Sequence, residues 1–260
     1  MTSRYSAWSL FAEGLRGHKG WSQAWSSPKL KTEYDFVIVG GGGHGLATAY
    51  YLTKVHGAKR VAVIEKGWIG GGNTGRNTVT IRSNYFYPES VALYDFALRA
   101  YEKLSAELNY NIMFSQRGIV TVAHSDAEME IAARLVNAMR INGADADLLT
   151  RAQVLEKIPL LNVSDQARYP VFGGVWQGRA GVARHDAVAW GYARAASARG
   201  VDIIQNCEVK AILRDATGAV SGVETTKGVI STRRLGVVCA GNTSVVMGMA
   251  GVKMPLESFP

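Results

Sequence analysis

Two apolar runs and the glycine-rich turn between them form the clearest pattern near the start of the chain. Residues 34–40 (YDFVIVG) are a short apolar run, and residues 46–54 place apolar side chains at helical spacing. A second apolar run, 61–64 (VAVI), follows. Short apolar runs bounded by glycine are typical of strands buried on both faces. The pattern therefore predicts a strand, a tight turn, a helix and a second strand, as in a parallel α/β sheet.

The rest of the chain alternates between helical and extended patterns. Apolar residues at helical spacing predict helices over 88–108, 126–141, 151–158 and 186–199. Extended segments are predicted over 79–82, over 112–123 as two short strands, over 168–177, and as a series over 201–240. Asn242 is predicted to cap a further helix after the last strand.

Composition narrows the class of protein. The 260 residues are 47% hydrophobic and 19% charged, a globular composition that excludes a disordered chain. No apolar run approaches the ~20 residues that a membrane span needs, so no membrane partner is expected. Cys207 and Cys239 lie far apart in the sequence, which indicates neither a disulfide framework nor a zinc site and favours a reducing cytoplasm.

Residues 1–33 form a basic arm in a chain whose net charge is +8. Trp8, Trp21 and Trp25 lie in this arm together with Arg4 and other basic residues, and acids are few. Because Trp and Arg favour interface cores, we expect the arm to dock on its own domain or on a partner subunit. An organelle transit peptide is an alternative interpretation. Nucleic acid is not expected as a partner, because no recognition motif accompanies the basic residues.

The turn after the first strand has the spacing of a dinucleotide-binding site. Gly40 would make the tight turn, Gly42 would let the backbone approach a pyrophosphate, and Gly45 would let helix and strand pack closely. Gly43 lies at the start of the helix, whose N-terminus favours phosphate. Glu65 follows twenty residues after Gly45, where a carboxylate accepts hydrogen bonds from ribose hydroxyls and repels a 2′-phosphate. A dinucleotide other than NADP is therefore predicted.

The loop after Glu65 favours FAD over NAD. Residues 66–78 are too rich in glycine for a helix, and a long Gly/Asn/Thr loop suits a backbone that wraps around a flavin ring. The last predicted strand ends at Gly241, which indicates a second close approach of backbone to cofactor. The remaining candidate cofactor contacts are Lys66, Asn73, Thr74, Asn77 and Val209.

Together these elements predict an α/β fold with a discontinuous, Rossmann-type FAD-binding domain and an inserted α+β substrate domain. The FAD-binding domain would comprise residues 34–83 and 180–250, and residues 84–179 would be part of the substrate domain. The chain stops abruptly at 256–260 (LESFP), without a helix stop or a tail. We therefore expect a truncated chain whose substrate domain continues beyond residue 260.

Motifs spread over most of residues 34–241 carry a resemblance to a known family. They are GGGGHGLATAYYL (40–52), EKGW (65–68), GGNTGRNT (71–78), IRSNY (81–85), FSQRG (114–118), RYPV (168–171), RHDAVAWG (184–191) and GVDIIQNCEV (200–209). With these motifs the chain resembles the beta subunits of heterotetrameric sarcosine oxidases, within the glycine oxidase and D-amino-acid oxidase group of flavoproteins. The combination is far more specific than the glycine spacing alone.

The resemblance implies an oxidative demethylation of sarcosine to glycine and a one-carbon unit, with electrons passing from noncovalent FAD to FMN and oxygen. Arg82 matches the arginine that holds the substrate carboxylate in related enzymes, a role that suits a guanidinium fork. His185 matches the histidine that carries FMN covalently, and the resemblance also implies that Arg76 helps to hold the FAD diphosphate. The resemblance also implies alpha, gamma and delta subunits as partners, with NAD and tetrahydrofolate on or with a partner.

Two alternatives stay open from the sequence. One is an FAD-dependent dehydrogenase that acts on another secondary amine or amino acid, such as an opine, proline or dimethylglycine. The other is a noncatalytic flavin-binding assembly subunit, for which flavin would bind but would not be reduced by any secondary amine.

Overall fold

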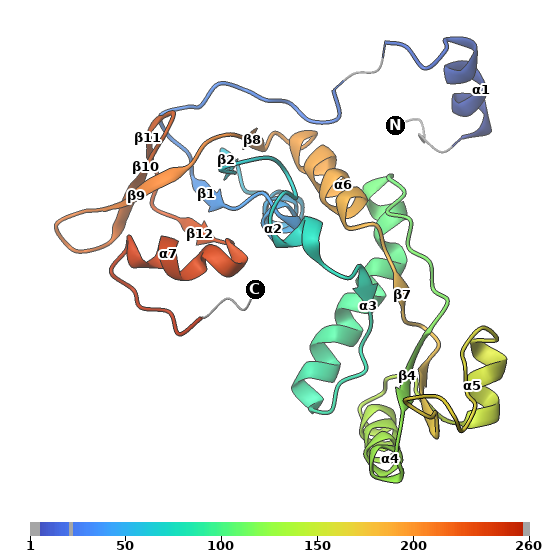
Figure 1. Cartoon of the computed structure of the whole chain (residues 1–260). Helices are drawn as coiled ribbons and strands as arrows, with labels where there is room; N and C mark the ends of the chain where they lie inside the picture. Colours follow the sequence, from blue (N-terminus) through green and yellow to red (C-terminus); the bar gives the residue numbers. More distant parts are fainter. Residues whose placement is uncertain (1–5, 21–22, 257–260) are drawn as a thin grey trace. The chain divides into compact units, whose positions relative to one another are not determined.

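The computed structural model describes residues 6–20 and 23–256, which divide into two compact units (Figure 1). Arg4 and Trp21 of the predicted arm lie outside the described residues. Unit 1 holds the described residues of Met1–Thr78, Leu108–Ile112 and His185–Pro260. Unit 2 holds Val79–Glu107 and Met113–Arg184. Among the described residues, no helix is long and apolar enough to cross a membrane.

Unit 1 is built on a parallel sheet whose four strands follow the order β12–β1–β2–β8. The strands are β1 Phe36–Val39, β2 Val61–Ile64, β8 Asp202–Ile204 and β12 Leu235–Val237. Val39 pairs with Ile64 on one side and with Val237 on the other, so the carboxyl ends of these three strands lie at one edge. All four residues of β2 are buried, because both faces of the sheet are covered. This sheet confirms the predicted α/β class.

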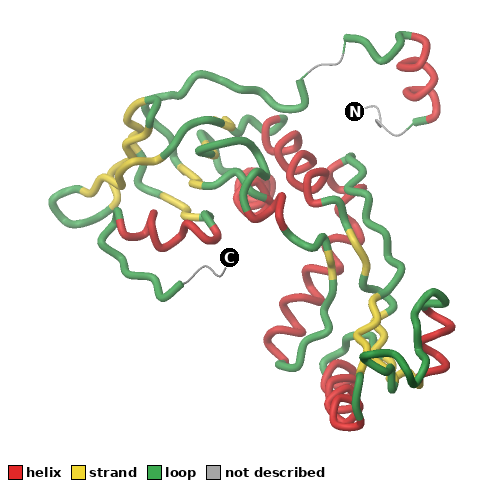
Figure 2. Tube along the Cα trace, in the orientation of Figure 1, coloured by secondary structure: helices red, strands yellow, loops and turns green. Residues whose placement is uncertain are grey.

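Helices cover one face of this sheet and an antiparallel sheet covers the other (Figure 2). The helices are α2 Gly43–Val55 and α6 His185–Ser197, which pack on each other through Tyr50 and Tyr192, with ring centroids 5.8 Å apart. The antiparallel strands are β9 Val209–Arg214, β10 Val220–Thr225 and β11 Gly228–Ser231. The core between the two sheets contains Val37, Val39, Ala62, Ile64, Val209, Val223 and Ile230, and the short helix α7 Thr243–Gly248 adds Val246.

The N-terminal arm has two structurally different parts. Helix α1 Ala7–Leu15 has no buried residue, although Ser6 caps it by accepting the Ser9 N–H. The segment that follows lies on unit 1. Lys31 forms an ion pair of 2.6 Å with Asp202, the Ser26 N–H donates to Ser197 Oγ at 3.0 Å, and Leu30 packs against the core.

Unit 2 contains an antiparallel sheet of three strands in the order β4–β6–β5. Its strands and helices are α3 Pro88–Leu108 (Leu108 itself belongs to unit 1), β4 Ile119–Ala123, α4 Asp126–Ile141, β5 Asp147–Thr150, α5 Arg151–Lys157 and β6 Gly173–Gln177. Helix α4 packs on one face of the sheet around Val136, Met139 and Val175, and α5 packs on the other around Val154. The two-residue strands β3 Thr80–Ile81 and β7 Gly181–Val182 form a separate antiparallel pair.

Three predicted segments differ from the observed structure. Of the two strands expected over 112–123, only β4 forms, because Ser115 makes an isolated bridge with Val182 instead of extending a strand. The strand expected over 168–177 begins only at Gly173. The loop 66–78, which was expected to contain no helix, holds the 3-10 turn η1 Asn73–Arg76. The predicted cap position is confirmed, because Asn242, which also ends a second such turn, η2 Ala240–Asn242, is the N-cap residue of α7, although its side chain makes no capping hydrogen bond.

Candidate functional site

The turn after β1 requires a glycine at Gly40 because of its neighbour across the sheet. Gly40 has φ +116°, a region that L side chains rarely adopt, and its N–H donates to Ile64 O at 2.8 Å. A Cβ at this position would lie 2.2 Å from the carbonyl oxygen of Val238, which follows β12. The turn is therefore held between the carboxyl ends of β2 and β12, where ligands bind in open α/β sheets.

Gly45 sets the distance between α2 and β1. A Cβ on Gly45 would lie 1.9 Å from Gly40 O and 3.5 Å from Ile38 Cγ2. Since helix and strand touch here through backbone, any side chain would push α2 away from the sheet. The first residues of α2 are thereby held at the edge formed by the carboxyl ends of the strands.

Several backbone N–H groups at the start of α2 have no hydrogen-bond acceptor among the described residues. Gly43 donates its N–H to Thr74 Oγ1 at 3.0 Å, whereas the N–H groups of Gly42, His44 and Gly45 find no acceptor in the described parts of the chain. These donors belong to the first helical turn, where the helix dipole favours negative charge. A pyrophosphate fits this arrangement, because its oxygens would satisfy several donors at once.

Glu65 lies at the carboxyl end of β2 and faces the same turn. Its carboxylate accepts the N–H of Gly41 at 2.7 Å and the N–H of Gly67 at 2.8 Å. A carboxylate has about four acceptor positions, so capacity remains for ribose hydroxyls. Sequence reasoning missed Gly41, although a Cβ there would lie only 2.8 Å from Glu65 Cβ and the run of four glycines includes it.

The loop after Glu65 folds back over the turn. Gly70 donates its N–H to Gly41 O at 3.0 Å, and Asn77 Nδ2 donates to Thr74 O at 2.7 Å, so the hydroxyl of Thr74 is held beside the start of α2. The other candidate side chains of this loop, Lys66, Asn73, Arg76 and Asn77, are exposed.

Residues from the end of the chain reach the same edge of the sheet. The N–H of Val238 donates to Val39 O at 2.8 Å, and Ala240 and Gly241 then turn away in η2. Cys239 donates its thiol to Val39 O at 3.3 Å, and burial raises the pKa of this thiol. The structure thus brings Gly241 to the same edge as the glycine turn. It places the side chain of Val209 in the core instead.

His185 is the first residue of α6. Its Nδ1 is buried and has no hydrogen-bond partner in the described residues, whereas Asp186 Oδ1 accepts the N–H of Ala187 at 2.8 Å. The first turns of α6 pack on the loop after Glu65, since a Cβ on Gly70 would lie 3.5 Å from Ala189 Cβ. A buried imidazole nitrogen without a partner is uncommon and calls for an explanation.

Arg82 belongs to unit 2 and follows β3. Its Nη1 donates to Asn84 Oδ1 at 2.5 Å, and its guanidinium lies 5.1 Å from the ring centroid of Tyr85. Tyr85 stacks on Tyr94 with centroids 4.1 Å apart. Burial, more than the hydrogen bond with Tyr94, raises the pKa of Tyr85, and the charge of Arg82 opposes that rise.

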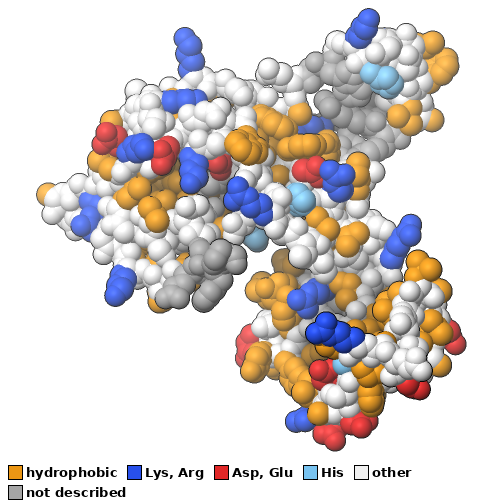
Figure 3. Space-filling view, viewed as in Figure 1, with side chains coloured by type: hydrophobic (Ala, Val, Ile, Leu, Met, Phe, Trp, Pro, Cys, Tyr) orange, Lys and Arg blue, Asp and Glu red, His pale blue; other side chains and the backbone are white. Residues whose placement is uncertain are grey.

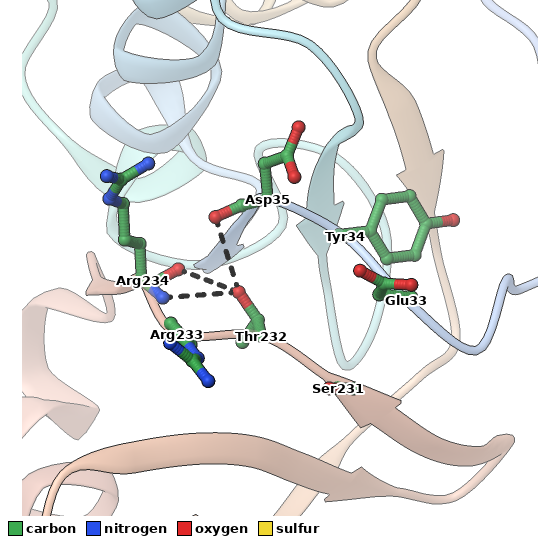
Figure 4. Close-up of a pocket in the computed structure, with 7 residues that line it drawn as sticks. All are labelled: Glu33, Tyr34, Asp35, Ser231, Thr232, Arg233 and Arg234. Atoms are coloured by element: carbon green, nitrogen blue, oxygen red, sulfur yellow. Dashed lines mark hydrogen bonds between the residues drawn. The ribbon is translucent and has the colours of Figure 1, made fainter.

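A separate crevice of about 490 Å³ lies at the opposite edge of the parallel sheet (Figure 4). Its lining residues precede β1 and β12: Glu33, Tyr34, Asp35, Ser231, Thr232, Arg233 and Arg234. The two acids pair with Arg60, at 3.2 Å for Glu33 and 2.5 Å for Asp35. Because ligands of such sheets bind at the carboxyl ends of the strands, this crevice is not the cofactor site.

Known proteins resemble the chain over most of its length. It is 53% identical to the sarcosine oxidase subunit beta of Rhizobium meliloti (strain 1021) and 51% identical to that of Rhodobacter capsulatus, each over 98% of this chain and 61% of the relative. The crystal structure of L-proline dehydrogenase from P. horikoshii matches with a TM-score of 0.80 and 28% identity, over 86% of this chain and 57% of that one.

The chain therefore spans about 61% of the length of the curated relatives that it matches, and the resemblance to sarcosine oxidase beta subunits is confirmed. Residues 35–259 match the family described as DAO, FAD dependent oxidoreductase. That range begins at the strand before the glycine turn and includes Glu65, the loop that covers the turn, and the strand end at Gly241. By sequence, fold and the arrangement of its nucleotide-binding turn, the chain belongs to the DAO family of FAD-dependent oxidoreductases.

Proposed function

We propose that this chain is the FAD-binding part of an enzyme that oxidatively demethylates sarcosine to glycine and a one-carbon unit. The observation that carries the proposal is the set of N–H donors at the start of α2 for which the described residues offer no acceptor, in a chain that is 53% identical to a sarcosine oxidase beta subunit. FAD, when bound, would supply the acceptor for a hydride from the N-methyl carbon.

The residues of this chain act by binding and orienting. The N–H groups of Gly42, His44 and Gly45 hold the pyrophosphate, and Glu65 holds the adenosine ribose. Arg82 binds the substrate carboxylate. No strong general base is needed, because an amine bound in its neutral form is already able to release hydride once it is correctly oriented.

The surroundings of Arg82 suit the binding of a substrate carboxylate. Some arginines of unit 2 have carboxylate partners in the structure, among them Arg99, Arg140, Arg151 and Arg179. Arg82 is half-buried, and no carboxylate of the described residues pairs with it. A partly buried guanidinium without a counterion favours an anionic ligand.

Anaerobic addition of sarcosine to the complete, FAD-loaded protein is expected to bleach the flavin absorbance at 450 nm. The second-order rate constant for bleaching should be about 10²-fold higher with sarcosine than with N-methylethylamine, which lacks the carboxylate. Glycine serves as the matched control without the N-methyl group. Preferential bleaching by proline would favour a dehydrogenase of another secondary amine, which the similarity to L-proline dehydrogenase keeps as the second candidate. Flavin that no secondary amine reduces would instead identify a noncatalytic subunit.

We further propose that His185 carries FMN covalently. This FMN, when bound, would supply the chemistry that passes electrons on to oxygen. The buried Nδ1, which has no partner among residues 6–20 and 23–256, supports this role, since burial leaves Nε2 as the nitrogen able to bond to the 8-methyl position of a flavin. Residues 66–78 contain no histidine, so this loop offers no imidazole that could bond to FAD, and FAD is proposed to be noncovalent.

His185→Ala is expected to abolish covalent FMN and to leave FAD in place. After acid precipitation, the wild-type pellet should retain FMN, whereas the variant should contain no FMN in either the pellet or the supernatant. FAD should be released into the supernatant from the wild type and from the variant. His124→Ala is the matched control, because its Nδ1 already has a partner in Pro170 O at 3.1 Å. Complete release of flavin from the wild type would refute the FMN assignment.

We also propose that α1 docks on a partner subunit of a heterotetramer with alpha, gamma and delta subunits, in the cytoplasm, with NAD and tetrahydrofolate bound by partners. Hydrophobic side chains are visible on the segment that holds α1 (Figure 3), and Trp8 and Phe11 are 73% and 57% exposed. The DAO match begins at residue 35, whereas the two beta-subunit alignments cover 98% of the chain and so include most of the arm. The arm is thus shared with proteins named as subunits.

The double change Trp8→Ser and Phe11→Ser is expected to weaken assembly with the partner subunits at least about 10-fold, because exposed aromatic residues often dominate interfaces. Co-purification through a tag on the partner measures the effect. Thermal stability and FAD content should not change, since α1 has no buried residue. Glu13→Gln, on the same helix, is the control, and assembly that survives the double change would exclude α1 as the docking element.

A further inference from the structure

Arg82 lies on a segment that has little regular structure of its own. Strand β3 ends at Ile81, one residue before it, and α3 begins only at Pro88. A bidentate hydrogen bond to a carboxylate needs a guanidinium whose plane and position are held closely. Side chains from other strands of unit 2 must therefore hold this segment.

Gln177 holds the residue next to Arg82. It is the last residue of β6 and is 1% exposed. Its Oε1 accepts the N–H of Ser83 at 2.9 Å, and its Nε2 donates to Ser83 Oγ at 2.7 Å and to Asp145 Oδ1 at 3.3 Å. Ser83 is fully buried, so this carboxamide replaces the strand partner that its backbone lacks.

Asn84 contacts the guanidinium itself. Its Oδ1 accepts from Arg82 Nη1 at 2.5 Å, and its Nδ2 donates to Thr121 Oγ1, on β4, at 3.4 Å. The carboxamide thus joins Arg82 to the sheet of unit 2. The ring of Tyr85 lies against the guanidinium on another side.

These contacts use only part of the donor set of Arg82. A guanidinium has five N–H donors, and Asn84 takes one at Nη1. The Nε and Nη2 groups form no hydrogen bond with any described residue, so one edge of the fork stays available for the two oxygens of a carboxylate.

We propose that Asn84 and Gln177 are positioning residues for Arg82, Asn84 by binding Nη1 directly and Gln177 by holding the backbone at Ser83, so that the guanidinium is set for a substrate carboxylate. This rests on the proposed function, in which Arg82 binds that carboxylate. Asn84 and Gln177 would thus act on substrate binding only through Arg82.

The test compares Asn84→Ala and Gln177→Met with Arg82→Ala in the complete, FAD-loaded protein with its partner subunits. Gln116→Met is the matched control, because Gln116 is an exposed glutamine of unit 2 that also binds through its carboxamide, to Glu102 Oε1 at 2.9 Å. The readouts are KM and kcat for sarcosine, the Kd of acetate from flavin difference spectra, FAD content and thermal stability.

Both positioning variants are expected to raise KM and the acetate Kd about 10-fold, while kcat stays within about threefold of the wild-type value. Arg82→Ala is expected to raise KM and the acetate Kd about 100-fold or more. A merely structural role would lower FAD content or thermal stability without this split between KM and kcat, and would overturn the inference. If Gln177→Met fails to fold, Asn84→Ala, a half-buried change, still decides the matter.

The pattern of results separates this inference from the proposed function. Weakened binding in Arg82→Ala with wild-type values in Asn84→Ala would overturn the positioning role and leave the role of Arg82 intact. Unchanged binding in Arg82→Ala itself would overturn both the carboxylate assignment and the positioning role built on it.

Discussion

Replacing Gly45 with alanine is expected to abolish FAD binding and to lower the free energy of unfolding by about 3 kcal/mol or more. The added Cβ would lie 1.9 Å from Gly40 O, a backbone atom that cannot rotate away, so α2 must shift from β1. That shift displaces the N–H donors of the first helical turn from the pyrophosphate. FAD content after gel filtration, together with thermal unfolding, measures both effects.

Gly43→Ala is the matched control in the same turn of helix. Its added Cβ would come no closer than 3.9 Å to the nearest atoms, those of Thr74, and the φ of Gly43 is not positive, so an alanine fits without a clash or backbone strain. The unfolding temperature should therefore hold or rise. If Gly45→Ala bound FAD as well as wild type, the close approach of α2 to β1 would not be what forms the site.

Arg82→Ala is expected to reduce kcat/KM for sarcosine by about 10²- to 10³-fold, mostly through KM. The reason is the loss of the proposed charged, bidentate partner for the carboxylate, at a half-buried position where no described carboxylate balances the guanidinium. Steady-state kinetics with sarcosine, and with N-methylethylamine as the substrate without a carboxylate, would show whether the loss is specific to the carboxylate.

Arg82→Lys should recover only part of the activity, because an ammonium group keeps the charge but not the fork. Arg99→Ala is the control, since Arg99 already pairs with Asp95 at 2.7 Å on α3 and is largely exposed. An equal loss of activity toward both amines in Arg82→Ala would assign the residue to the fold and not to the substrate.

The elements that the sequence predicted best are those that depend on neighbouring residues. Helix α4 runs from Asp126 to Ile141, the range that helical spacing predicts, and Ser125 caps it by accepting the Glu128 N–H at 3.2 Å. The segment from β1 through α2 to β2 was likewise predictable, because two apolar runs and a glycine spacing within about 30 residues specify it.

Segments whose structure depends on a distant partner were predicted poorly. Ser115 was expected in a strand next to β4, but its N–H donates to Val182 O at 2.8 Å and it forms only a bridge. Local pattern does not encode which remote backbone a segment meets.

By itself, the sequence determined the class of fold, the glycine spacing with its acid at Glu65, and the residue types that suit a flavin and a carboxylate. Only the tertiary structure decided which of these groups remain available to ligands. Gly40 must be glycine because Val238 O lies across the sheet, and Arg82 keeps free donors because Asn84 takes only Nη1 and no described carboxylate is near. Whether a donor is satisfied or free depends on atoms brought together by folding, and not on its neighbours in the chain.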